Sequence, residues 1–87
     1  MLLVVDFADL GLEANFADIR LKENADFKVA ELLNKLSDGV EEITGKPIGN
    51  RLMLDLLDGS GSRIDPARKV CDLQLNDWDT LYIVRRR

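Results

Sequence analysis

Apolar and polar residues alternate along three stretches of this chain, and the alternation predicts β-strands at residues 2–7, 16–22 and 78–84. Side chains of a strand point to its two faces in turn, so one face of each stretch is expected to be buried. The inward side chains are expected to be Leu3, Val5 and Phe7, then Ala17, Ile19 and Leu21, and finally Leu81 and Ile83. The first two strands are joined by a hairpin loop at 9–15, which is longer than an ideal two-residue turn, and strands so close in sequence should pair antiparallel.

The second half of the chain predicts a further strand at residues 51–57, followed by a turn and a loop. The expected pattern places Leu52, Leu54 and Leu56 inward and Met53, Asp55 and Leu57 outward. The Asp, Gly and Ser residues of segment 58–62 are typical of a turn. After this turn, Arg63 and Ile64 are expected to form a very short strand, and residues 65–69 a loop. The next apolar residues should pack a turn or short helix against the core: Val70, Leu73 and Leu75.

Helical periodicity predicts one helix, whose buried face recurs every three or four residues as Val29, Leu33, Leu36, Val40 and Ile43. The side chain of Asn24 or Asp26 is expected to accept a backbone N–H at its start. Gly45, followed by Lys and Pro, is expected to end it. Two hairpins crossed by one helix predict an α+β domain, with a mixed sheet of four to five strands packed on one main helix. The first and last strands should lie parallel at the centre of that sheet.

Composition favours a single folded domain spanning residues 1–87, with 46% hydrophobic and 32% charged residues. The net charge is −4, and the part before the three terminal arginines is more acidic still. An acidic surface repels phosphate backbones, so no nucleic-acid partner is expected. The apolar run 1–5 ends at Asp6 and is too short to cross a bilayer or to act as a signal peptide, so no membrane insertion is expected.

Side chains that could carry out chemistry are sparse. The chain has no histidine, which removes the commonest general base and the commonest neutral metal ligand. Cys71 is the single cysteine, which fits a reducing cytoplasmic location, and we expect it to be a half-buried packing residue. Segment 58–62 lacks the acidic ligands of a calcium loop and the pattern of a phosphate-binding loop. We therefore expect no catalytic residue, no metal site and no cofactor.

Three stretches of the second half resemble ubiquitin in their order and spacing: Arg51-Leu52-Met53-Leu54, Arg68-Lys69-Val70-Cys71-Asp72-Leu73 and Asp79-Thr80-Leu81-Tyr82-Ile83-Val84. The first half is similar to the YukD/EsaB family in Val5-Asp6-Phe7, Phe16-Ala17-Asp18-Ile19-Arg20-Leu21 and Val29-Ala30-Glu31-Leu32-Leu33. These proteins are small ubiquitin-like accessory proteins of bacterial type VII (WXG100, Ess) secretion systems. The resemblance implies the ubiquitin-like β-grasp fold and a non-enzymatic, cytoplasmic adaptor. It implies a protein partner, such as a membrane subunit or an ATPase of the secretion machinery.

The outer face of the predicted sheet is the expected partner-binding site. The third strand should lie beside the last one, so that Met53, Tyr82 and Val84 form one exposed apolar patch. The rim of the patch is expected to contain Arg51, Asp55 and Arg85. The resemblance implies that this face docks a partner, and an apolar patch with a polar rim fits a modest protein interface. Scattered apolar residues are also common on surfaces that bind nothing, and self-association stays an open alternative.

The residues after the last predicted strand, 85–87, are expected to form a flexible basic tail. Conjugated ubiquitin-like proteins end in Gly-Gly, which this sequence lacks, so the resemblance implies a protein that is not conjugated. A covalent modifier or sulfur carrier would require a natural chain that continues past Arg87 or is processed. An alternative is a small ubiquitin-like structural subunit of a multicomponent, toluene-type monooxygenase, a class in which such subunits carry no catalytic residue.

Overall fold

The computed structural model of the protein describes residues 1–12, 14–21 and 26–86. The strands are β1 (Leu2–Asp6), β2 (Phe16–Arg20), β3 (Leu54–Leu57) and β4 (Thr80–Arg85). The main helix is α1 (Val29–Thr44), and the short 3₁₀ helices are η1 (Ala8–Leu10), η2 (Arg51–Met53) and η3 (Val70–Leu73). None of the helices within these described ranges is long and apolar enough to cross a membrane.

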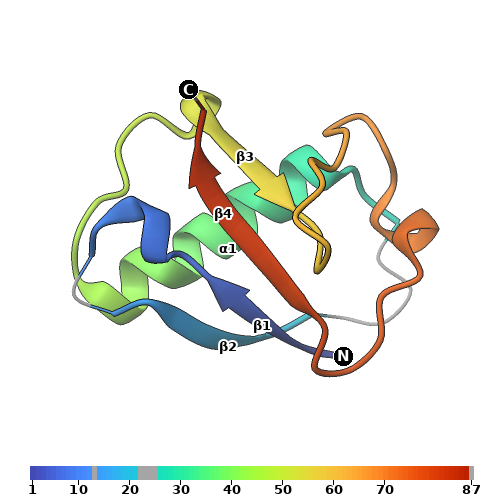
Figure 1. Cartoon of the computed structure of the whole chain (residues 1–87), viewed down its shortest axis with the longest axis horizontal. Helices are drawn as coiled ribbons and strands as arrows, with labels where there is room; N and C mark the ends of the chain where they lie inside the picture. The colour runs from blue at the N-terminus through green and yellow to red at the C-terminus, as the bar shows by residue number, and fades with distance from the viewer. Residues whose placement is uncertain (13, 22–25, 87) are drawn as a thin grey trace.

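The four strands form one mixed sheet in the order β2-β1-β4-β3, with α1 packed across one face (Figure 1). Strand β1 pairs antiparallel with β2 and parallel with β4, and β3 pairs antiparallel with β4. The predicted hairpin and the predicted central pair of parallel strands are therefore confirmed. Two hairpins grasping one helix are the topology of a β-grasp domain of the ubiquitin-like kind.

The core lies between the sheet and α1, where the predicted strand residues meet the helix. The side chains of Leu3, Val5 and Phe7 have no exposed surface, and Leu81 and Ile83 are also buried. Each large apolar side chain removed from water in this way stabilises the fold by about 1.5–3 kcal/mol. Most of the other residues predicted to face the core also do so, with Ala17, Leu21 and Val70 buried and Ile19, Leu73 and Leu75 packed against the core.

The buried face of α1 differs from the predicted one. Leu32 is fully buried, whereas Leu33 is only partly buried and Ile43 is 54% exposed. The face that meets the sheet consists of Val29, Leu32, Leu36 and Val40. Neighbouring leucines both fit a spacing of three to four residues, so the pattern could not decide between Leu32 and Leu33. The tertiary packing selects Leu32 and turns Leu33 toward the side of β3.

The start of α1 is held by backbone groups of a distant loop. Its N-cap is Lys28, without a capping side chain, and the N–H groups of Val29 and Ala30 donate to the carbonyls of Arg68 and Pro66. The first N–H groups of a helix have no partner within the helix, and the sequence predicted that a capping side chain would accept one of them. Here backbone carbonyls accept them instead. The predicted cap by Asp26 is wrong, since its carboxylate faces the Lys69 ammonium at 3.3 Å, and Asn24 lies outside the described residues. Gly45, in the left-handed region, ends the helix as predicted.

The predicted strand 51–57 is shorter in the structure, because its first three residues form η2. The side chain of Asn50 accepts the N–H of Leu52 at 3.0 Å and starts this turn. Leu52, predicted to be inward, is 81% exposed as a result. The short strand predicted at Arg63 and Ile64 is only an isolated bridge between Leu57 and Arg63, so the sheet has four strands within the described part of the chain.

Candidate functional site

The face of the sheet that points away from α1 carries a row of apolar side chains on its two strands nearest the β3 edge. Side chains alternate along each strand, so the residues opposite to the buried set lie on this face. These residues are Leu2, Val4 and Asp6 of β1, Phe16, Asp18 and Arg20 of β2, Asp55 and Leu57 of β3, and Thr80, Tyr82 and Val84 of β4. The predicted placement of Tyr82 and Val84 on the outer face is therefore confirmed.

Tyr82 and Val84 line a shallow pocket of about 280 Å³. Leu57, which is the cross-strand neighbour of Tyr82, forms its floor with them, and the loop residues 59–61 form its wall. We name the surface made by Met53, Leu57, Tyr82 and Val84 the docking face. An apolar hollow of this size can receive one side chain of a partner protein.

Met53 lies at the end of the same row. It is half exposed, and its carbonyl accepts the N–H of Arg86 at 2.6 Å. This bond continues the β3–β4 pairing by one step beyond Leu54 and Arg85. The predicted members Met53, Tyr82 and Val84 therefore lie along one side of the sheet.

The loop that walls the pocket is held by one carboxylate. Asp58 accepts hydrogen bonds from the Ser60 N–H at 2.9 Å, the Ser60 hydroxyl at 2.6 Å and the Ser62 N–H at 3.0 Å. The bond from the Ser60 hydroxyl is the main cause of a pKa for Asp58 below its ordinary value. Gly61 has a φ of +86°, which favours glycine. The pocket wall is thus shaped before any partner arrives.

Asp55 carries two ion pairs on the docking-face side of the sheet. Its carboxylate lies 3.0 Å from the guanidinium of Arg86 and 3.1 Å from that of Arg63. The bond from Arg86, followed by that from Arg63, holds the pKa of Asp55 below its ordinary value. The side chain of Asp55 is only 15% exposed, so the arginines form the polar rim here. Asp55 was predicted as a rim residue, and the structure adds its two partners.

Arg51 lies elsewhere than the sequence predicted. Its guanidinium is 2.7 Å from Asp38 and 2.8 Å from Glu41, and it also donates to the carbonyl and side-chain oxygens of Asn34. The hydrogen bond from Arg51 lowers the pKa of Glu41. All three partners belong to α1, so Arg51 ties η2 to the helix and does not rim the docking face.

The sequence predicted that Arg85 and Arg86 belong to a flexible tail, but both residues make defined contacts in the structure. Arg85 ends β4, and its N–H donates to the Asp9 carboxylate at 2.9 Å. Its guanidinium approaches the carbonyl of Leu10 at 3.5 Å, which places it beside η1. The rim position predicted for Arg85 is filled by Arg86 through its contact with Asp55. Arg87 lies outside the described residues.

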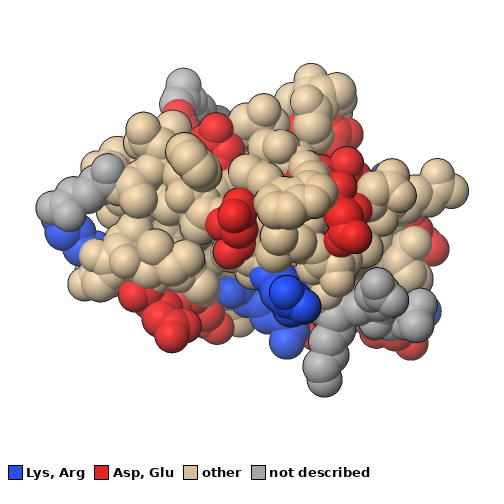
Figure 2. Space-filling model, turned by 90° about the horizontal axis from the view of Figure 1, so that it is seen from below, with Lys and Arg blue, Asp and Glu red and all other residues tan. Residues whose placement is uncertain are grey.

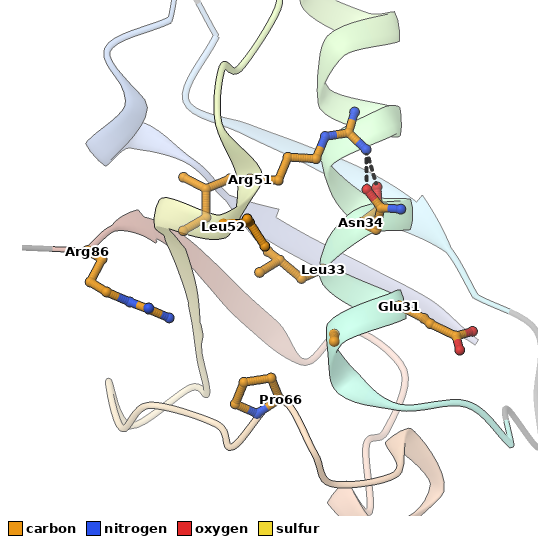
Figure 3. A pocket seen from close by; sticks show the side chains of 9 residues that line it. Glu31, Leu33, Asn34, Arg51, Leu52, Pro66 and Arg86 are labelled. Atoms are coloured by element: carbon orange, nitrogen blue, oxygen red, sulfur yellow. Dashed lines mark hydrogen bonds between the residues drawn. The ribbon is translucent and has the colours of Figure 1, made fainter.

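A second hollow, of about 410 Å³, lies between α1 and the β3 edge of the sheet. Its lining residues are Ala30, Glu31, Leu33, Asn34, Arg51, Leu52, Leu54, Pro66 and Arg86 (Figure 3). We name this hollow the helix–β3 groove. The apolar pattern of the sequence did not indicate this hollow, because that pattern placed Leu33 and Leu52 in the core. The available signal was the Gly49-Asn50 pair, which is typical of a turn and argued against a strand at Leu52.

The remaining chemistry of the described surface is modest. Figure 2 shows acidic and basic side chains in separate small groups with uncharged surface between them. Among the residues that the structure describes, no three His, Cys, Asp or Glu side chains gather where they could hold a metal ion. Cys71 is exposed, in contrast to its predicted half-buried position, and its sulfur lies 3.9 Å from the Asp72 carboxylate. The lone thiol lies in the turn of η3, outside both hollows.

The fold is that of a ubiquitin-like β-grasp domain, and it carries a row of apolar side chains on the outer face of β3 and β4 and two hollows. No protein-family model matches this chain, and no curated protein sequence matches it.

Proposed function

We propose that this protein is a non-enzymatic, cytoplasmic ubiquitin-like adaptor that docks on a bacterial type VII secretion machinery. The observation that supports it most is the docking face on a β-grasp sheet, with Tyr82 and Val84 around a preformed hollow. The likeness of its strand and helix sequences to the YukD/EsaB family supports the choice of machinery. The partner would be a membrane subunit or an ATPase of that machinery.

The docking face has the composition of a modest protein interface. Aromatic residues and Met are enriched at interfaces, while charged residues are depleted from their centres. Here Tyr82 and Met53 supply the apolar contact, and Arg86 and Arg63 remain at the rim, bound to Asp55. Tyr82 is half-buried and packed in a strand, so little conformational entropy is lost when a partner covers it. Binding by such a surface requires no chemistry from the side chains.

The experiment is a pull-down of the secretion membrane subunit and the ATPase by the double variant Met53→Asp with Tyr82→Ala. We expect the variant to keep its fold and to lose capture, because a buried apolar contact is replaced by a charge. The matched control is Ile43→Asp, which places the same charge on an equally exposed apolar residue of α1. Unchanged capture by the double variant would show that the docking face is not the binding surface.

The same purified complexes test which machinery is involved. Co-elution with secretion components from native cells supports the proposal. Co-elution with a di-iron oxygenase would favour the monooxygenase subunit and overturn the secretion assignment, while the docking face would still be tested by its own variants.

A further inference from the structure

The two margins of the sheet differ in what covers them. Figure 1 shows β2 at one margin and β3 at the other. On the β3 margin, the carbonyl of Leu56 accepts the N–H of Ile64 at 2.9 Å, and Leu57 forms a bridge with Arg63. Within the described ranges, the backbone of β2 bonds to β1 and to no segment on its other side. Such an edge presents unpaired N–H and C=O groups to which another strand can bond.

The pairing of β2 with β1 shows which backbone groups lie at the open edge. Leu21, next to the end of β2, donates its N–H to the carbonyl of Met1 at 2.7 Å. Backbone groups alternate in direction along a strand, so those of Ile19 also point to β1. The N–H and C=O groups of Asp18 and Arg20 therefore point to the open edge. Both residues are exposed, so a second strand can reach them.

The charges of these two residues make the edge complementary to itself. A second copy of β2 can lie antiparallel beside the first, with a two-fold axis between the two copies of Ile19. Asp18 of each copy then lies directly opposite Arg20 of the other, and such opposite residues exchange backbone N–H···O bonds. Opposite charges placed across two strands stabilise the pairing. Neither charged side chain is paired with another residue in the described part of a single chain, so both are available to the second copy.

Other registers of the same two strands are less favourable. A slip of two residues places Asp18 opposite its own copy, and like charges directly opposite each other repel. A slip of one residue places Asp18 opposite Ile19, whose backbone groups already bond to β1. Charge and hydrogen bonding therefore select the register that is centred on Ile19.

This register also brings apolar surface together on the face that carries α1. Ile19 is only partly buried in the single chain, and it meets its own copy at the centre of the pair, where opposite side chains lie closest. The helix approaches β2 at Gly39, where an added Cβ would lie 3.1 Å from the Cδ1 of Ile19. Ile43 follows one turn later on this side of α1 and is 54% exposed. The axis keeps both helices on one face of the joined sheet, with these sides turned toward each other.

We propose that two copies of this protein form a symmetric dimer through their β2 edges, so that their sheets join into one. The interface is isologous, with each Asp18 paired with the partner's Arg20 around the central Ile19 pair. The β2 edge is the margin opposite to β3, so the dimer does not depend on the function proposed above. Both docking faces stay free and lie on one side of the joined sheet, which allows two sites of one assembly to be bound together.

Sedimentation velocity of the full-length protein over a series of concentrations measures the dimer. Asp18→Arg and Arg20→Asp each place like charges opposite each other, and each should raise the dissociation constant by about tenfold or more. An equimolar mixture of the two variants should form dimers again, because the strand with two basic positions then lies opposite the strand with two acidic ones. The matched control is Glu31→Arg, which makes the same charge change at an exposed position of α1 beside the helix–β3 groove. The control should stay within about twofold of the parent.

Amide hydrogen exchange locates the interface. The N–H groups of Asp18 and Arg20 should exchange more slowly at high protein concentration than at low, while that of Ile19 should be protected at both. A parent that is monomeric at every concentration overturns the proposal. So does a dimer that survives both variants, a mixture that fails to dimerise, or concentration-dependent protection confined to Tyr82 and Val84. A variant that had lost its fold would not regain dimerisation on mixing, so recovery in the mixture separates loss of pairing from loss of structure.

Discussion

Two neighbouring leucines of α1 should differ sharply in their contribution to stability. Leu32 is fully buried against the sheet, while Leu33 is partly buried beside the helix–β3 groove. Leu32→Ala removes buried carbon atoms and leaves a cavity, which costs about 3–5 kcal/mol. Leu33→Ala removes the same atoms from a position already in contact with water, so its cost should be about 1 kcal/mol.

The cost of Leu32→Ala is large for a domain of this length. Stabilities of about 0.05–0.15 kcal/mol per residue give a free energy of unfolding of about 4–13 kcal/mol for this chain. Urea denaturation followed by circular dichroism measures both variants, with an m-value near 1 kcal/mol per molar expected for a small domain. The midpoint should fall by about 3 M for Leu32→Ala and by about 1 M for Leu33→Ala.

The ranking of these two variants is the decisive result. A larger loss for Leu33→Ala would mean that the helix presents the face predicted from periodicity alone. The buried set described for α1 would then be wrong. Equal losses would mean that both leucines are buried, which would also close the helix–β3 groove.

Other consequences concern acid stability and the loop that walls the pocket. The pKa of Asp55 is lower in the folded protein, so its contribution to stability is present above its ordinary value of 3.8 and is lost as pH falls through the folded value. Asp55→Asn should therefore show a smaller difference in urea midpoint between about pH 7 and about pH 3 than the parent does. Gly61→Ala should lower stability by about 1–2 kcal/mol in thermal or urea melts, because Gly61 has a φ of +86°. Gly59→Ala is the control and should be nearly neutral, since the added carbon would lie 3.7 Å from the carbonyl oxygen of Thr80.

The strands were predictable because their residues alternate and because one face of each is buried. Leu3, Val5 and Phe7 could face only the core once Asp6 was assigned to water, and the same reasoning placed Leu81 and Ile83. A shift by one residue would expose the whole apolar set, so the pattern admits a single register.

The helix face and the helix cap were less predictable for a physical reason. Periodicity defines a broad stripe, and only the position of the sheet selects Leu32 within it. The N–H groups at the start of α1 find the carbonyls of Pro66 and Arg68, which lie far away in sequence. No local pattern near Asp26 could show that a distant loop would take the place of a side-chain cap.

The candidate sites depend on one turn that the strand pattern concealed. The side chain of Asn50 binds the N–H of Leu52 and starts η2, so the strand begins only at Leu54. This turn moves Leu52 out of the core and carries the guanidinium of Arg51 to α1. The same hydrogen bond therefore accompanies three differences from the sequence prediction. Leu52 is outside the core, Arg51 does not rim the docking face, and the exposed Leu52 lines the helix–β3 groove.

Edge strand β3 separates the two surfaces, and Arg86 reaches both. It binds Asp55 on the side of the docking face and also lines the helix–β3 groove. Met53→Asp and Leu52→Asp change neighbouring residues of the same turn, but each changes only one of the two surfaces. A partner that is lost with Met53→Asp and retained with Leu52→Asp therefore binds the docking face, and the opposite result places it in the groove. Since both side chains are at least half exposed, neither result can be attributed to a collapsed core.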